Sequence, residues 1–235
     1  LGEAGYFPCR YPHATYAAMI STLDERIGAL INTLKAEGTD ENTLIVFSSD
    51  NGPTFNGGTD SPWFHSGGPF KSERGWGKAF LHEGGIRVPM IVRWPGHVPA
   101  GRVDTESVTS FIDWMPTLAS ISGIESLPQQ IDGEDVSDAW RGADRKRTKP
   151  LFWKTSSVGS SPAMRDGKWK LHVIGRRKNA TVELYDLAAD PSESQNVAAQ
   201  HPEVVRAMQA KLDAWIAELP TTYEKATDRN RSSEE

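Results

Sequence analysis

Residues 44–52 read Leu-Ile-Val-Phe-Ser-Ser-Asp-Asn-Gly, an apolar run that ends in a carboxylate, a carboxamide and a glycine. The apolar string at 44–47 is typical of a strand covered on both faces, as in a parallel α/β sheet. In such folds ligands bind just beyond the carboxyl ends of the strands. Asp50 and Asn51 supply two hard oxygens, which suit Ca²⁺ or Mg²⁺ better than zinc or copper. The alternative is a plain turn, because Asp, Asn and Gly all favour turns.

A glycine-rich segment follows this strand. Residues 52–85 show neither helical nor strand periodicity and hold nine of the 21 glycines. Structureless segments of this length within compact domains are usually functional. Lys78 lies in the segment, and its ammonium suits an oxyanion held on a neighbouring metal, although a solvated surface charge is the simpler interpretation of a lone lysine. The apolar run that begins at Met90 predicts the next strand.

Four motifs in this order resemble the formylglycine-dependent sulfatases of the alkaline phosphatase superfamily. They are Ser49-Asp50-Asn51-Gly52, Gly77-Lys78, Glu83-Gly84-Gly85-Ile86-Arg87-Val88-Pro89 and Arg93-Trp94-Pro95-Gly96. The resemblance implies that Asp50 and Asn51 bind Ca²⁺, with Mg²⁺ as the alternative ion. It also implies that Lys78 contacts the sulfate and stabilises the transition state, and that Glu83 only shapes the loop.

The chain holds too few ligands and strands for a complete site of this kind. Calcium takes roughly six to eight oxygens, and sheets average about five or six strands. Only two strands of the parallel type are evident before residue 149. We therefore expect that an amino-terminal segment is missing. In the resembled family that segment carries further acidic ligands and the nucleophile, a Cys or Ser in a Cys/Ser-x-Pro/Ala-x-Arg pattern that is oxidised to formylglycine.

Two residues near the start invite a catalytic role that their surroundings do not support. Cys9 is followed by Arg10-Tyr11-Pro12, so the proline comes one place too late and the arginine is absent. We interpret Cys9 as a packing residue or a free thiol. His13 stands at the entrance of a helix that we predict over 15–35, where a capping or surface role is the simpler interpretation.

Composition limits the classes of partner. The formal charge of −5 and the pI near 5.7 argue against nucleic acid. No apolar stretch approaches the length that crosses a bilayer, so we expect no membrane span. The single cysteine rules out an internal disulfide and says nothing of the redox compartment. Periplasmic or secreted localisation is what the family resemblance implies.

The rest of the chain predicts a second, smaller unit. A short helix begins near Ser110 and ends near Gly123, with Asp113 as its cap. Four antiparallel strands are predicted, and an amphipathic helix follows them. The strands are expected at 150–155, 163–166, 169–174 and 181–187, and the helix at 202–219. The motif from Leu184 to Asn196 resembles a structural signature of the family's carboxyl-terminal subdomain.

The predicted fold class is therefore α/β, with an alkaline-phosphatase-like sheet, incomplete here, followed by a small α+β subdomain. We divide the chain into 1–148, the carboxyl-terminal part of a catalytic domain, then 149–220, the small subdomain, and 221–235, a polar tail.

The resemblance implies hydrolysis of a sulfate ester, on a sulfated carbohydrate or an aryl sulfate. His65 is the preferred substrate contact. The neighbouring aromatic residues Trp63, Phe64 and Trp76 suit either a substrate pocket or the packing of a long loop. Two alternatives stay open: a phosphate or phosphonate ester hydrolase of the same superfamily, and a non-catalytic fragment that binds sulfated glycans. The chain alone is expected to be inactive.

Overall fold

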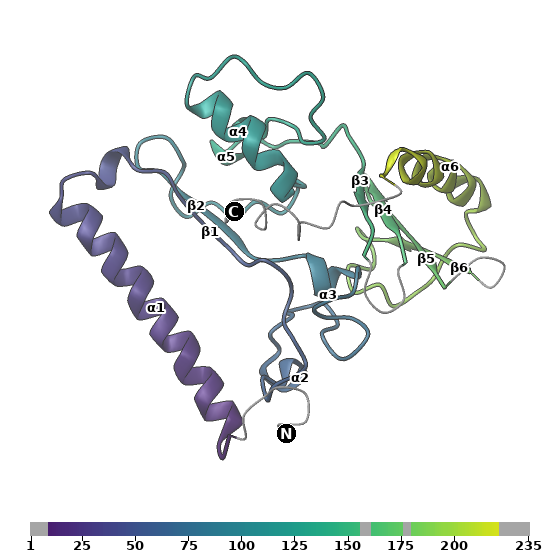
Figure 1. The fold of residues 1–235 in the computed structure, drawn as a ribbon, viewed down its shortest axis with the longest axis horizontal. Coiled ribbons are helices and arrows are strands. Elements are labelled where there is room, and N and C mark those ends of the chain that lie inside the picture. Colours follow the sequence, from purple (N-terminus) through teal and green to yellow (C-terminus); the bar gives the residue numbers. More distant parts are fainter. Residues whose placement is uncertain (1–8, 156–160, 176–179, 221–235) are drawn as a thin grey trace, which may run out of the picture.

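The computed structural model describes residues 9–155, 161–175 and 180–220. Within these ranges the chain forms two separate sheets, and the short helix α3 lies between them (Figure 1). Two short 3-10 helices, Asp40–Asn42 and Phe111–Asp113, complete the secondary structure of these ranges. The longer elements are α1 Pro12–Ala36, β1 Ile45–Ser48, α2 Ser61–Phe64, α3 Glu83–Ile86, β2 Met90–Arg93, α4 Trp114–Ile121, α5 Ser137–Trp140, β3 Leu151–Trp153, β4 Ala163–Asp166, β5 Trp169–Ile174, β6 Thr181–Asp186 and α6 Pro202–Glu218. The predicted tail at 221–235 lies outside the described residues.

The first sheet is a two-stranded antiparallel ribbon in which Ile45 pairs with Arg93 and Ser48 with Met90. The expectation of parallel pairing was therefore wrong. An apolar run does not encode the direction of its partner, and here the segment between the strands brings the chain back beside the end of β1. Ser48 Oγ donates a hydrogen bond of 2.8 Å to Pro89 O at that point.

The prediction that β1 is covered on both faces was also wrong for the described chain. Val46 and Val92 face a small core formed by Val136 and Trp140 of the α5 region. The opposite face carries Phe47 and, paired with it, Ile91, whose exposed fraction is 59%. The ribbon is thus closed by helices on one side and open on the other.

Helix α1 confirms the predicted amphipathic helix and starts three residues earlier, because Pro12 occupies its first turn. None of its residues is buried, and Met19 and Leu30 expose 63% and 58% of their surfaces. Figure 1 shows α1 projecting away from both sheets. An apolar stripe at helical spacing normally packs against a core. The stripe of α1 has no such partner among the described residues, so the position of the helix depends on the contacts at its two ends.

The second sheet confirms the predicted four antiparallel strands, in the order β3-β4-β5-β6. Its tight turn between β4 and β5 has Gly167 in left-handed backbone at a φ of 58°. Helix α6 runs along one face (Figure 1). The core between sheet and helix consists of Met164, Leu171, Leu184, Met208 and Leu212. The α/β class with a small antiparallel subdomain is confirmed.

The segment between the sheets is held by buried carboxylates. Asp113 caps the turn that opens α4, in a capping box with Ser110, which confirms its predicted role. Arg147 also reaches Asp113 Oδ2 at 2.6 Å, and both side chains are nearly inaccessible to solvent. Glu134 accepts hydrogen bonds from Thr148 and from the backbone N–H of Lys149. These bonds tie the connection at 147–149 to the segments that precede α4 and α5.

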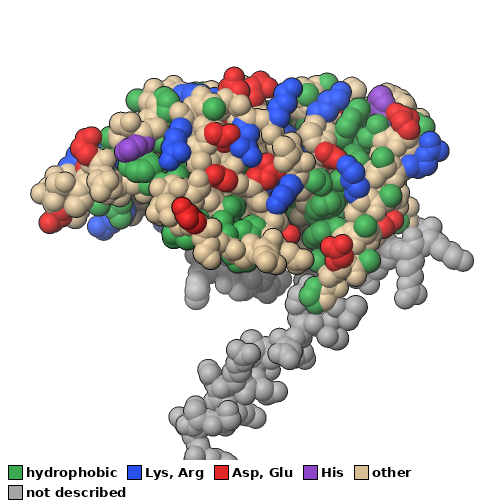
Figure 2. Space-filling view, turned by 90° about the horizontal axis from the view of Figure 1, so that it is seen from above, with side chains coloured by type: hydrophobic (Ala, Val, Ile, Leu, Met, Phe, Trp, Pro, Cys, Tyr) green, Lys and Arg blue, Asp and Glu red, His purple; other side chains and the backbone are tan. Residues whose placement is uncertain are grey.

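The charged surface is mixed. On the face shown in Figure 2, lysine and arginine side chains alternate with aspartate and glutamate, without a continuous basic area. None of the described helices has the length and apolar character needed to cross a membrane.

Candidate functional site

The Asp50-Asn51-Gly52 and Glu83-Gly84-Gly85 motifs meet backbone to backbone. Gly52 N donates a hydrogen bond of 2.8 Å to Gly85 O. A Cβ added at Gly52 would lie 1.9 Å from Gly84 O, which no real side chain tolerates. The glycine is therefore required by this close approach.

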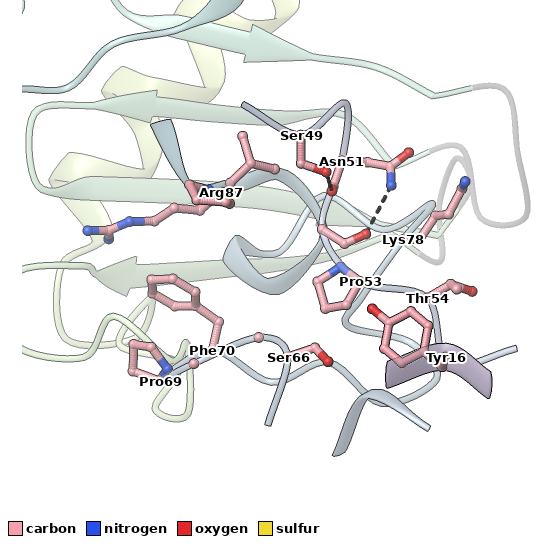
Figure 3. Close-up of a pocket in the computed structure, with 15 residues that line it drawn as sticks. Tyr16, Ser49, Asn51, Pro53, Thr54, Ser66, Pro69, Phe70, Lys78 and Arg87 are labelled. Atoms are coloured by element: carbon pink, nitrogen blue, oxygen red, sulfur yellow. Dashed lines mark hydrogen bonds between the residues drawn. The ribbon is translucent and has the colours of Figure 1, made fainter. Parts of the chain in front are cut away.

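The same packing places Lys78 beside the end of β1. Lys78 N donates a hydrogen bond of 2.9 Å to Pro53 O, and a Cβ at Gly77 would lie 2.5 Å from that oxygen. Lys78 and Asn51 consequently line one cavity of about 630 Å³. Figure 3 shows both side chains on the same side of the cavity, whereas Arg87 extends to the other side.

The cavity is built entirely from the first 89 residues. Tyr16 of α1 and Phe70 of the glycine-rich loop contribute aromatic surface, and Lys78 and Arg87 contribute positive charge. Its lining consists of Tyr16, Ser49, Asn51, Gly52, Pro53, Thr54, Ser66, Gly67, Gly68, Pro69, Phe70, Lys78, Arg87, Val88 and Pro89. A pocket with two cations and apolar walls is suited to an anionic group on a larger organic molecule.

Asp50 does not share this cavity. It is exposed and lines a separate hollow of about 310 Å³ with Phe111 and Trp114, and Ser49 is common to both hollows. Asn51 and Lys78 therefore share one cavity, whereas Asp50 lines the other, and their assignment as metal ligands and sulfate contact stays a prediction.

The oxygens of Asp50 and Asn51 are chemically suited to a hard cation. Among the described residues, no hydrogen bond or ion pair involves the Asp50 carboxylate. Asn51 Nδ2 donates a hydrogen bond of 3.0 Å to Gly52 O, so its amide oxygen is directed away from that bond. Within the described ranges no group of three or more His, Cys, Asp or Glu side chains is placed to hold a metal. The two residues fit a calcium ion as part of a larger set.

His65 is not among the residues that line the cavity, although its neighbour Ser66 is. His65 is exposed and has left-handed backbone, with a φ of 51°, at the end of α2. Its role as a substrate contact stays a prediction.

Two aromatic residues of the loop, Trp63 and Phe64, pack against helix α1. Trp63 stacks on His13 with 4.3 Å between ring centroids, and Phe64 meets Tyr16 edge to face at 5.1 Å. His13 lies within α1 and its Nε2 is 2.9 Å from Asp60 Oδ2, so it ties α1 to this loop instead of capping the helix. The packing interpretation therefore holds for Trp63 and Phe64. Cys9 lies near the start of α1, with its Sγ 3.1 Å from Thr15 Oγ1.

A buried ionic network was not foreseen from the sequence. It joins Glu83 of α3 to β5 and to the loop after β6. Lys170 Nζ lies 2.7 Å from Glu83 Oε1 and 3.2 Å from Glu193 Oε1, and His172 Nε2 lies 2.8 Å from the same Glu193 oxygen. Glu83 N donates a hydrogen bond of 2.5 Å to Glu193 Oε2. We refer to Glu83, Lys170, His172 and Glu193 as the buried network.

Electrostatics favour a charged Glu193 and neutral histidines in this region. Burial raises the pKa of Glu193, but the hydrogen bond from His172 and the charge of Lys170 outweigh it and lower the pKa to about 2. Burial and the neighbouring His172 lower the pKa of His82 to about 4. His82 stacks on His172 at 4.4 Å, and neither of its ring nitrogens has a hydrogen-bond partner.

A sequence signal for the buried network did exist. Leu171 of β5 faces the core under α6, so Lys170 and His172 must point to the opposite face. That face is covered by the α3 region, which makes both polar side chains buried. The motif containing Glu193 was predicted to be structural, and these contacts confirm it.

Comparisons with known proteins agree with the four motifs. A family model described as "Sulfatase" matches residues 4–124, and one described as "N-sulphoglucosamine sulphohydrolase, C-terminal" matches residues 72–219. The chain is 31% identical to N-acetylgalactosamine-6-O-sulfatase of Bacteroides thetaiotaomicron over 87% of its length and 44% of the relative's. It is 29% identical to human arylsulfatase A over 94% of its length and 48% of the relative's.

A solved structure is also similar to the chain over most of its length. The structure of Ps i-CgsB in complex with k-i-k-neocarrahexaose matches with a TM-score of 0.75 and 28% identity, over 93% of this chain and 47% of the other. The chain thus spans about half the length of the relatives that it matches.

Proposed function

Because the chain belongs to the sulfatase family, we propose that the protein containing it hydrolyses a sulfate ester. The observation that carries this proposal is the cavity that Asn51 and Lys78 both line, so that an amide oxygen and an ammonium face the same hollow. A sulfate ester is a tetrahedral anion whose oxygens gain charge as the bond to the leaving group breaks. An ammonium beside these oxygens stabilises that charge.

The residues of the chain have distinct roles in this proposal. Lys78 binds the sulfate oxygens and stabilises the transition state, while Asn51 and Asp50 contribute oxygens to a calcium site. Calcium, when bound, supplies Lewis-acid stabilisation of the oxyanion. The nucleophile, a formylglycine, comes from outside the 235 residues.

The proposed substrate class is a sulfated carbohydrate or an aryl sulfate. The cavity volume lies within the roughly 300–1,000 Å³ typical of organic ligand sites. Tyr16 and Phe70 offer aromatic surface for a sugar or aryl ring. The relatives act, by their names, on N-acetylgalactosamine-6-O-sulfate and aryl sulfates. We place the whole protein in the periplasm or outside the cell, where sulfated glycans are met.

The test is the variant Lys78→Ala in the full-length protein. We expect kcat on a chromogenic aryl sulfate to fall about 10²–10³-fold, as on removal of other oxyanion donors, without a change in the thermal unfolding midpoint. Lys35→Ala, which removes an exposed lysine at the end of α1, is the matched control and should leave kcat unchanged. Near-normal turnover of Lys78→Ala would refute its assignment.

The same assays separate the two alternative functions. Faster hydrolysis of a matched phosphate or phosphonate ester would replace the sulfatase proposal by the first alternative. Binding of a sulfated glycan without turnover of any ester would favour the second. Chelation followed by addition of Ca²⁺ or Mg²⁺ tests the ion, and we expect Ca²⁺ to restore turnover and Asp50→Ala to weaken that restoration.

A further inference from the structure

The loop that bears Lys78 is fixed from two directions. On one side, the backbone of Gly52 and Pro53 holds Gly85 and Lys78, as described above. On the other side, Glu83 is buried with 2% of its surface exposed and meets Lys170 of the carboxyl-terminal sheet. The second attachment joins a cavity-forming loop to a strand that contributes nothing to the cavity lining.

The turn that carries Lys78 rests directly on the α3 backbone. Phe80 N donates a hydrogen bond of 3.0 Å to Gly77 O, which closes the turn around Lys78. A Cβ at Gly85 would lie 2.1 Å from Phe80 O and 2.5 Å from Gly77 O. With no free space between them, a displacement of α3 must displace the turn, and with it the Lys78 ammonium.

Lys170 holds α3 through a buried ion pair with Glu83 that is costly to separate. Its side chain is fully buried, and the side chains of Glu83 and Glu193 expose no more than 3% of their surface. Separating such a pair leaves a charge without a partner in a medium of low dielectric constant, which is strongly unfavourable. Arg87 and Arg165 also approach Glu83, but at 3.5 and 3.8 Å and on the other carboxylate oxygen. Neither replaces the bond from Lys170.

We propose that Lys170 is a positioning residue for the sulfate-ester hydrolysis proposed above: through Glu83 it fixes α3 and thereby the Lys78 ammonium at the cavity. Lys170 itself does not touch substrate. The proposal rests on the proposed function, and it assigns to the carboxyl-terminal sheet a part in the chemistry of a cavity that it does not line.

The test compares Lys170→Met with Lys211→Met in the full-length enzyme. Lys211 forms an exposed ion pair of 2.6 Å with Asp166 on the neighbouring strand, so it controls for loss of a lysine near the same sheet. For Lys170→Met we expect kcat on an aryl sulfate to fall about 10- to 100-fold, because small misplacements of a catalytic group have large effects. Hydrogen exchange of the amides at 77–86 should quicken. Lys211→Met should change neither, and Lys170→Arg should recover part of the turnover.

A double variant keeps the proposal falsifiable if Lys170→Met destabilises the fold. Glu83→Gln with Lys170→Met removes the ammonium together with the carboxylate that it meets at 2.7 Å, and Glu193 keeps its contacts with His172 and with the backbone N–H of residue 83. Loss of both partners is often less destabilising than loss of one. We expect the double variant to unfold at a higher temperature than Lys170→Met, while kcat stays low and exchange at 77–86 stays fast. A double variant with wild-type kcat would overturn the proposal, as would Lys170→Met with unchanged kcat and exchange.

The two proposals fail in different ways. Absence of sulfate-ester turnover in the wild-type full-length protein defeats the proposed function. Hydrogen exchange does not need turnover, so it still decides whether Lys170 holds the loop that carries Lys78.

Discussion

The two sheets of this chain differ in how much of their apolar surface is buried. The sheet β3–β6 packs on α6 around five residues that expose no more than 3% of their surface. The ribbon β1–β2 has one open face, and α1 has no buried residue at all. Both cavities described above lie in this open part. The residues of the candidate site therefore lie where the described chain is least closed.

Apolar patterning and burial are therefore separate properties of a segment. Helix α1 carries an apolar stripe in its sequence, as α6 does, yet only α6 meets a sheet. The relatives are about twice as long as this chain. The part of the chain that the structure describes covers neither α1 nor the outer face of the ribbon.

The largest effect on stability should come from the closed sheet. Leu212→Ala removes a fully buried side chain between α6 and the sheet. We expect it to lower the free energy of unfolding by about 2–5 kcal/mol, because it loses apolar burial and leaves a cavity. Urea unfolding of the chain, followed by tryptophan fluorescence, measures the change. A loss below about 1 kcal/mol would show that the core is less well packed than described.

The second effect concerns the boundary between the two parts, where His82 stacks on His172. The pKa of His82 falls from 6.5 to about 4 on folding, through burial and the charges of His172, Lys170 and Lys71, opposed by Glu193. Between these values only the unfolded chain binds the proton, so stability falls as the pH drops through this window. His82→Phe keeps an aromatic ring between Trp76 and His172 but cannot bind the proton. It should therefore reduce the loss of stability as the pH falls.

Unfolding at pH 6.5 and pH 5 measures this difference. Glu193 contributes stability that is lost only below its unfolded pKa of about 4.5, so it does not interfere in that range. An equal pH dependence in the wild type and in His82→Phe would contradict the assignment.

The smallest effect should come from the open helix. Leu30→Ala removes a side chain that is 58% exposed and introduces the best helix former. We expect the free energy of unfolding to change by less than about 0.5 kcal/mol. Binding of a hydrophobic dye should decrease, since the apolar face becomes smaller. A destabilisation like that of Leu212→Ala would mean that α1 packs against another surface in solution.

Several elements were predictable because they depend on local sequence. Strands β3–β6, helix α6, the cap at Asp113 and the resemblance to sulfatases are confirmed. The antiparallel pairing of β1 with β2 was not predictable, because an unbroken apolar run carries no information about strand direction. The separation of Asp50 from Lys78 was missed for a related reason, since motif order does not say which way each side chain points.

The four-residue helices α2 and α3 were not predicted. The family, the longer helices, the strands and the motifs that contain Asn51 and Lys78 followed from the sequence alone. These are properties of short segments, set by periodicity, turn chemistry and motif order. Only the tertiary structure decided which residues share a cavity, and that Lys170 reaches Glu83 across 87 positions of the chain. Contacts of this kind depend on how loops without periodicity fold back on distant strands, and no local pattern encodes that geometry.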